Sequence, residues 1–264
     1  MSEELLLDES PYRPPDAELQ PAREPLQRGL GDSPDGPDPT RIDLERALRY
    51  PFTNPEWWKT ALIIGVLQFV PLVGIVVQYG WLQRIFDAVR AGSDEQMPSV
   101  SVGDDLSRGW KPLGTVFVGG MVLTLIMWIV MMLPVLLAAM VGAVLGEDSA
   151  GPVMAILGMA SMFPVLLGMV MVYLMGPELL RRCLCGDWFG MLRWRQAVQT
   201  IKAAPVPYLT LLATLLIALM GMYAGMFALY IGFLITVPLG MAVAMHGLAQ
   251  WHRHLEHLQA DGLD

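Results

Sequence analysis

The feature that most constrains the fold is a run of 49 residues, 203–251, that contains no Asp, Glu, Lys or Arg. A second run without these residues covers positions 113–146. About 18 consecutive apolar residues are typical of a transmembrane helix. Water-soluble domains carry roughly 25% charged residues, whereas this chain carries 16%. The sequence therefore predicts an all-α integral membrane protein.

Four segments are predicted to cross the membrane. Residues 205–251 would form a helix of about 70 Å, which exceeds a hydrocarbon core of about 30 Å. We therefore divide this run into helices at 206–228 and 230–251, with a turn at the glycines of "MGMYAGM". The other two crossings are expected at 113–141 and 153–175, and the segment between them has two acids and no base.

The first apolar segment, residues 57–91, has two interpretations. Trp57, Trp58 and Lys59 precede it, as is typical of a membrane interface. Lys and Arg flank the segment on both sides, and such short loops stay cytoplasmic. Pro71 lies near its centre, which favours a short or re-entrant hairpin with arms at 57–70 and 72–91. A single crossing is the alternative. With the hairpin, the chain forms three helical hairpins and both termini are cytoplasmic.

The remaining segments complete the predicted organisation. Residues 1–39 are acidic and proline-rich, so we expect a disordered tail without a cleaved signal peptide. The polytopic domain is expected at 40–258, and a C-terminal tail at 259–264. Thr40 is the expected N-cap of a short amphipathic helix lying at the membrane surface. The net charge of −8 comes mostly from the tail, and we expect no nucleic-acid partner.

A basic segment, residues 176–204, is the strongest cytoplasmic signal. We expect its arginines to lie at the lipid headgroups, with two tryptophans beside them. These residues are Arg181, Arg182, Arg193, Arg195, Trp188 and Trp194.

No catalytic, cofactor-binding or metal site is predicted, because the four predicted crossings contain no Asp or Glu. His246 lies in an apolar run, where we expect an interfacial histidine bonded to a neighbour; a ligand or proton-relay role is the alternative. The segment "HRHLEH" supplies His252, His254 and His257. A solvated helix end is expected there, with metal binding as the alternative.

The two cysteines, two pairs of methionines and two glutamines each have two interpretations. Cys183 and Cys185 are too close for a structural disulfide and indicate a reducing compartment; alternatively they bind a soft metal. Methionine pairs one helical turn apart, at 127 and 131 and at 241 and 245, suit packing or Cu(I). Gln68 and Gln78 are expected to bond the broken backbone around Pro71, with a substrate site as the alternative.

Three segments together resemble a known family. They are "YPFTNPEWWKTALIIGVLQFVPLVGIVVQYGWLQRI", "WRQAVQTIKAAPVPYL" and "FLITVPLGMAVAMHGLAQWHR". The resemblance is to a prokaryotic multi-pass membrane protein family of unknown function, the domain-of-unknown-function 4013 family. It covers about residues 41–253 and implies a polytopic membrane protein without an assigned activity. The long acidic tail and the methionine-rich middle pair depart from it.

These observations lead to two function hypotheses. The first is a non-enzymatic multi-pass protein of the cytoplasmic membrane that organises partners or the bilayer. Its expected partners are the lipid bilayer and membrane proteins, or further copies of the chain. The second is a small transporter or channel with helices broken at Pro71, Pro134, Pro164 and Pro238. Coupled transporters usually carry ionisable groups at mid-depth, so their absence from the predicted spans favours the first.

Overall fold

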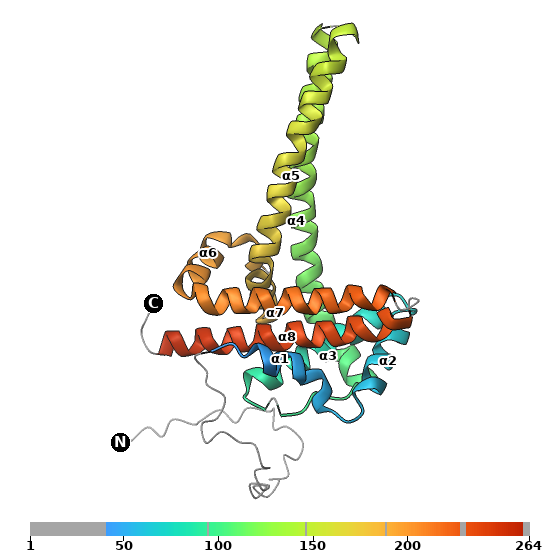
Figure 1. The fold of residues 1–264 in the computed structure, drawn as a ribbon, viewed down its shortest axis with the longest axis vertical. Helices are drawn as coiled ribbons and strands as arrows, with labels where there is room; N and C mark the ends of the chain where they lie inside the picture. Colours follow the sequence, from blue (N-terminus) through green and yellow to red (C-terminus); the bar gives the residue numbers. More distant parts are fainter. Residues whose placement is uncertain (1–40, 94, 146, 188, 228–230, 261–264) are drawn as a thin grey trace, which may run out of the picture. The chain divides into compact units, whose positions relative to one another are not determined.

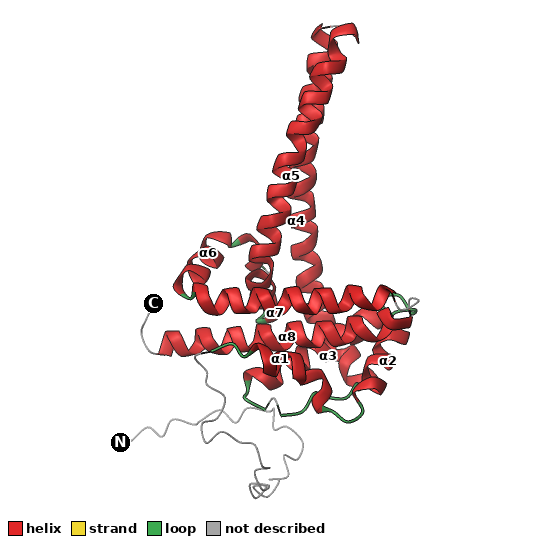
Figure 2. Ribbon diagram, in the orientation of Figure 1, coloured by secondary structure: helices red, strands yellow, loops and turns green. Residues whose placement is uncertain are grey.

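The computed structural model describes residues 41–93, 95–145, 147–187, 189–227 and 231–260, and the regular elements in these ranges are helices (Figures 1 and 2). The predicted all-α fold is therefore confirmed for the described residues. The predicted tail at 1–39 lies outside them. The elements are α1 (Leu44–Arg49), η1 (Tyr50–Thr53), α2 (Trp57–Leu67), α3 (Val73–Arg90), α4 (Val102–Leu145), α5 (Glu147–Leu184), η2 (Gly190–Leu192), α6 (Trp194–Ala203), α7 (Pro205–Ala224), η3 (Gly225–Phe227) and α8 (Ile231–Ala260).

Within the described residues, three helical segments are long and apolar enough to cross a membrane. They are Val102–Val144 in α4, Pro205–Phe227 in α7 and η3, and Gly232–Ala260 in α8. They contain the crossing predicted at 113–141 and most of the crossings predicted at 206–228 and 230–251. The crossing predicted at 153–175 lies within α5, several of whose side chains are outside the described set. A crossing by α5 stays a prediction.

The first apolar segment is broken where the sequence predicts. Helix α2 ends at Leu67 and α3 begins at Val73. Leu72 has a φ of 68°, a left-handed conformation that is rare outside glycine. The break at Pro71 is confirmed, whereas entry and exit on one side of a membrane stays a prediction.

The other predicted breaks are wrong. Helices α4, α5 and α8 continue through Pro134, Pro164 and Pro238. Proline removes one backbone hydrogen bond, but membrane helices tolerate this loss where neighbouring groups satisfy the freed carbonyl. Proline in an apolar helix is therefore a weaker breaking signal than proline beside a turn.

Helix α8 forms the centre of the main core and packs against α7, α3 and α2. The largest fully buried side chains of this core are Trp81 and Trp251. Short helix α1 packs on α7 and α8 through Ala47, which is fully buried. Its N-cap is Asp43, whose Oδ1 accepts a 2.9 Å hydrogen bond from the Arg46 amide. Asp43 rather than Thr40 therefore caps this helix.

Helices α3 and α4 approach closely because two glycines face the opposing backbone. A Cβ on Gly80 would lie 1.9 Å from the carbonyl oxygen of Asp105, and one on Gly109 would lie 1.8 Å from that of Val76. The contact is held by an ion pair, in which Arg84 Nε donates to Asp105 Oδ1 at 2.6 Å. Asp105 is fully buried, so this pair fixes the position of α4 on α3.

Helices α4 and α5 lie side by side along most of their length (Figure 1). The outward side chains of α4 are large and apolar, such as Phe117, Leu125 and Ile129, each about 60% exposed. None of the described residues in its most apolar stretch is fully buried by the rest of the chain. The outer surface of α4 thus lacks a protein partner within the described residues.

Candidate functional site

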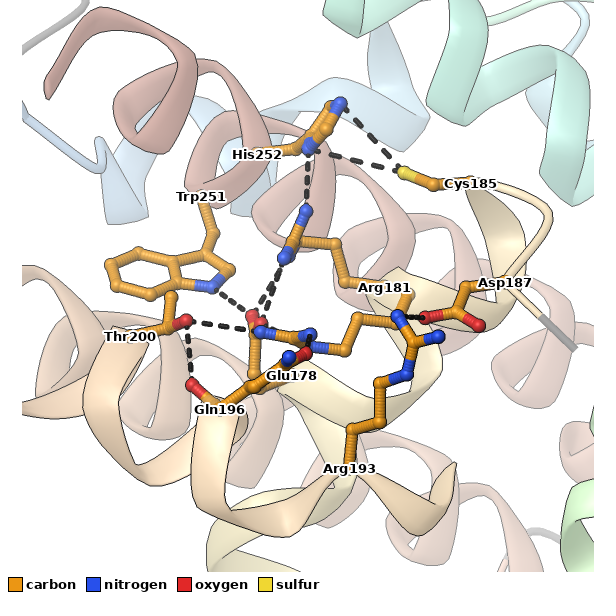
Figure 3. Close-up of polar contacts among 10 residues, drawn as sticks. Glu178, Arg181, Cys185, Asp187, Arg193, Gln196, Thr200, Trp251 and His252 are labelled. Atoms are coloured by element: carbon orange, nitrogen blue, oxygen red, sulfur yellow. Dashed lines mark hydrogen bonds and ion pairs between the residues drawn. The ribbon is translucent and has the colours of Figure 1, made fainter. Parts of the chain in front are cut away.

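A fully buried carboxylate, Glu178, lies near the C-terminal end of α5 (Figure 3). Its Oε1 accepts hydrogen bonds from Arg181 Nη2 at 2.7 Å and Arg182 Nε at 2.9 Å. Its Oε2 accepts from Arg181 Nε at 2.8 Å and from the indole Nε1 of Trp251 at 2.9 Å. Two of the donor residues come from the next turn of α5, and the third comes from α8.

The two arginines extend this contact to neighbouring helices. Arg181 Nη1 lies 2.8 Å from Nδ1 of His252 on α8. Arg182 donates to Gln196 Oε1 at 3.0 Å and to Thr200 Oγ1 at 3.1 Å, both on α6. We call Glu178, Arg181, Arg182, Trp251 and His252 the ionic cluster. It joins the ends of α5, α6 and α8.

The ionisation of Glu178 follows from these contacts. Burial alone would raise the pKa of Glu178, because a charge is costly away from water. The hydrogen bonds and charge of Arg181, the Trp251 indole and the charge of Arg182 outweigh burial and hold that pKa below its ordinary value. Glu178 is therefore ionised at neutral pH. Four hydrogen bonds occupy its two oxygens, which suits a structural anchor rather than a proton donor or acceptor.

The protonation of His252 follows from its partner. Arginine has N–H donors and no acceptor, so Arg181 makes Nδ1 of His252 an acceptor and places the ring proton on Nε2. That Nε2 lies 3.4 Å from Glu256 Oε1 and 3.8 Å from Cys185 Sγ. Glu256 in turn pairs with Arg90 of α3, an exposed ion pair at 2.5 Å. The cluster thereby also reaches α3.

The thiol beside His252 is not activated. Partial burial of its sulfur raises the pKa of Cys185, and the charges of Arg181 and Arg90 offset this only in part. A nucleophilic cysteine needs a lowered pKa, because the thiolate is the reactive form. Neither Cys183 nor Cys185 forms a disulfide within the described residues; Cys183 is buried and Cys185 is exposed. This geometry gives no support for a Cys–His nucleophile.

The basic segment differs in part from its prediction. Arg181 and Arg182 have side chains only 12% and 14% exposed, and they point to Glu178 rather than outward. Arg193 is half exposed and pairs with Asp187 at 3.2 Å, and Arg195 is exposed. Trp194 is 45% exposed, whereas Trp188 lies outside the described residues. The spacing of Glu178 to Arg181 and Arg182, three and four residues along a helix, was the signal for this pairing.

The predicted solvated end at "HRHLEH" is wrong, because the last turns of α8 pack against α3 and α5. His252 and His254 are buried, and His257 is half-buried. The hydrogen bond predicted for His246 is confirmed, because its Nδ1 lies 3.2 Å from Nε2 of its neighbour Gln250, whereas its place at a membrane interface stays a prediction. Among the described residues, no group of three or more His, Cys, Asp or Glu could hold a metal ion.

The glutamines around Pro71 pair with each other instead of bonding the broken backbone. Gln68 Nε2 donates to Gln78 Oε1 at 2.8 Å, and Gln78 Nε2 donates to the sulfur of Met241 on α8 at 2.6 Å. Met241 therefore accepts a hydrogen bond within the helix packing. In the other pair, Met127 packs toward Gly168 of α5 while Met131 is 46% exposed. Met127 and Met131 line one apolar cavity, and Met241 and Met245 line another, so packing and Cu(I) binding both stay predictions for these pairs.

Comparison with known proteins gives a family but no activity. The family model described as "Protein of unknown function (DUF4013)" matches residues 63–237. No curated protein and no solved structure matches the chain. The match covers most of the chain, including α3, α4, α5, α6 and α7, and it agrees with the predicted resemblance. This chain belongs to the DUF4013 family of proteins of unknown function.

Proposed function

We propose that this chain is a non-enzymatic, multi-pass protein of the cytoplasmic membrane that organises membrane partners or the bilayer itself, with both termini cytoplasmic. The observation that carries the proposal is the contrast between two parts of α5. Its C-terminal end is fixed by the ionic cluster to α6 and α8. The rest of α5 pairs with α4, whose outer surface is apolar and unburied.

The apolar surface of α4 supports the membrane assignment. Soluble monomers rarely expose contiguous apolar patches larger than a few hundred Å². Side chains such as Phe117, Leu125 and Leu136 are exposed along the length of α4 and would be costly in water. In a bilayer, lipid chains cover such a surface, and a second membrane protein or another copy of the chain can do the same.

The state of the polar groups supports a non-enzymatic role. The buried acid, Glu178, has both oxygens occupied by donors. The thiol of Cys185 has a raised pKa, and the neighbouring His252 is held by Arg181. General acid–base or nucleophilic catalysis needs such a group to be accessible and near its working pKa. These contacts suit an anchor that sets the positions of helices.

A small transporter or channel is the second candidate, and the break between α2 and α3 favours it. Broken membrane helices line the substrate sites of many transporters. The connected polar atoms of Gln68, Gln78 and Met241 lie beside this break. Since these atoms bond one another, we place this candidate second.

One preparation tests both candidates. The full chain is expected to stay in the membrane fraction after carbonate washing. When the purified protein is placed in liposomes, the flux of ions and solutes should equal that of empty liposomes. Release of the chain by carbonate would contradict the membrane assignment. Saturable flux that is lost in the Gln68→Leu, Gln78→Leu double variant would establish the transporter instead. The exposed pair Glu45→Gln, Arg49→Gln is the matched control, because these side chains lie outside the break.

A further inference from the structure

A polar cavity of about 360 Å³ lies where α3, α4 and the end of α5 meet. It is lined by Gln83 and Asp87 of α3, Arg108 and Lys111 of α4, and Cys185 just after α5. Its volume is within the range of small-molecule pockets, and it holds more polar groups than the apolar cavity between α4 and α5.

The charges in this cavity favour an anion. Arg108 and Lys111 are exposed, and neither has an ion-pair partner in the described parts of the chain. Asp87 contributes one negative charge, so the lining carries a net charge of +1. Arg and Lys together bind phosphate oxygens through several N–H donors. A ligand with a single negative charge would neutralise the net charge of this lining.

A neutral acceptor adds a second requirement. The Oε1 atom of Gln83 is buried and has no hydrogen-bond partner within the described ranges, while its Nε2 donates to Asp87 at 3.0 Å. A buried acceptor without a donor is unfavourable, because it has lost its hydrogen bonds to water. The ligand should therefore carry an O–H or N–H group within reach of its phosphate.

The position of the cavity on α4 indicates where this phosphate comes from. Lys111 is followed by Pro112, which also lines the cavity, and then by the charge-free run that begins at Leu113. If α4 crosses the bilayer, the cavity lies at the border between the headgroups and the hydrocarbon. Lipid phosphates lie at this depth, and lipid chains would continue along the apolar turns of α4 that begin at Leu113.

We propose that this cavity binds the headgroup of an anionic phosphodiester lipid that bears a hydroxyl group, such as a phosphatidylglycerol. The phosphate lies between Arg108 and Lys111, and the headgroup hydroxyl donates to Gln83 Oε1. The assignment rests on the proposed membrane location and adds the lipid class to it.

Binding is measured on the full chain purified in detergent, so the result does not depend on membrane insertion. The probe is short-chain dioctanoyl phosphatidylglycerol. It is titrated into the protein, and the bound lipid is measured by native mass spectrometry. Phosphatidylmethanol has the same charge without a hydroxyl, phosphatidylcholine has no net charge, and glycerophosphoglycerol is the headgroup without acyl chains. We expect phosphatidylglycerol to bind about fivefold more tightly than phosphatidylmethanol, the effect of one hydrogen bond.

Two variants assign the binding to this cavity. Arg108→Gln with Lys111→Gln should weaken phosphatidylglycerol binding about tenfold or more, because each base near an anionic lipid contributes about 1 kcal/mol. Arg195→Gln with Lys202→Gln is the matched control, since it removes one exposed Arg and one exposed Lys from α6. Gln83→Leu should remove the preference for phosphatidylglycerol over phosphatidylmethanol and leave phosphatidylmethanol binding unchanged.

Each contrary result overturns a defined part of the proposal. Equal binding by the cavity variant and its control would exclude the cavity. Equal binding of phosphatidylcholine would exclude charge recognition, and an unchanged preference in Gln83→Leu would exclude the hydroxyl contact. Tight binding of glycerophosphoglycerol would assign the site to a soluble phosphodiester. Release of the chain by carbonate would contradict the membrane location alone, because lipid binding is measured separately.

Discussion

The indole Nε1 of Trp251 donates a 2.9 Å hydrogen bond to Oε2 of Glu178, although 73 residues separate the two in sequence. Both side chains are fully buried. The bond connects α8, the centre of the main core, with the base of the α4–α5 pair. A buried carboxylate that accepts from an indole and two arginines fixes the relative position of these helices, because the arginines lie on α5 and the indole lies on α8.

Replacing Glu178 by glutamine should destabilise the fold strongly. The neutral amide would lack the negative charge that compensates Arg181 and Arg182, which are nearly buried. Removing one partner of a buried ion pair typically costs about 3–5 kcal/mol. Thermal unfolding of the purified protein in detergent should show a markedly lower midpoint for Glu178→Gln.

The matched control for this change is Glu45→Gln. Glu45 pairs with Arg49 one turn along α1, but its side chain is 71% exposed. Exposed pairs contribute between 0 and about 1 kcal/mol, so the midpoint should change little. Equal midpoints for the two variants would mean that the ionic cluster does not hold the helices together.

The same carboxylate predicts how stability depends on pH. The pKa of Glu178 is lowered in the folded chain, so its contribution to the free energy of unfolding is complete above its ordinary value of 4.5. That contribution is lost as pH falls through the lower folded pKa. Below about pH 4.5, wild-type stability should therefore fall more steeply than that of Glu178→Gln. Unfolding midpoints measured from pH 7 to pH 3 test this, and parallel curves would show that Glu178 does not titrate in this range.

The contact between α3 and α4 should fail when a methyl group is added at Gly109. A Cβ there would lie 1.8 Å from the carbonyl oxygen of Val76, and a backbone atom cannot move aside as a side chain can. We expect Gly109→Ala to lower stability by about 1–3 kcal/mol, the usual cost of overpacking. Gly103→Ala is the control in the same helix, because a Cβ at Gly103 meets nothing within 4 Å. An unfolding midpoint for Gly109→Ala that matches the control would show that the helices are not in close contact.

Local sequence predicted the helices better than it predicted their contacts. The charge-free runs and the break at Pro71 follow from hydropathy and backbone chemistry within one segment, and the structure agrees with both. The burial of Arg181 depends on Glu178 within the same helix but also on Trp251 and His252, which are distant in sequence. Sequence spacing therefore indicated the pair within α5, but not its position against α8.

The histidines near the C-terminus illustrate the same limit. Next to Arg253 and Glu256, His252 and His254 are typical of a solvated helix end, yet both are buried because α3 and α5 pack against these turns. The glycines show this limit too. In "GMYAG", a Cβ on Gly225 would lie 1.9 Å from Oγ1 of Thr236, whereas a Cβ on Gly221 meets nothing within 4 Å. The closest α3–α4 contacts involve Gly80 and Gly109, which lie in different segments.

The predicted topology has a direct test in single cysteine variants. If α2 and α3 enter and leave on the cytoplasmic side and α4 and α5 extend outward, the chain on either side of the first hairpin stays inside. Cysteines at Ser2 and Ser93 should then resist an impermeant thiol reagent in intact cells, and one at Ser149 should react. Ser93 is exposed at the end of α3, so protection there would reflect the membrane rather than burial in the protein. Cys183 and Cys185 are replaced first, and permeabilised cells provide the control, in which all three positions should react. Reaction at Ser2 with protection at Ser93 would mean that residues 57–91 cross once. The arrangement of three hairpins would then be wrong, because one crossing before α4 places the N-terminus outside.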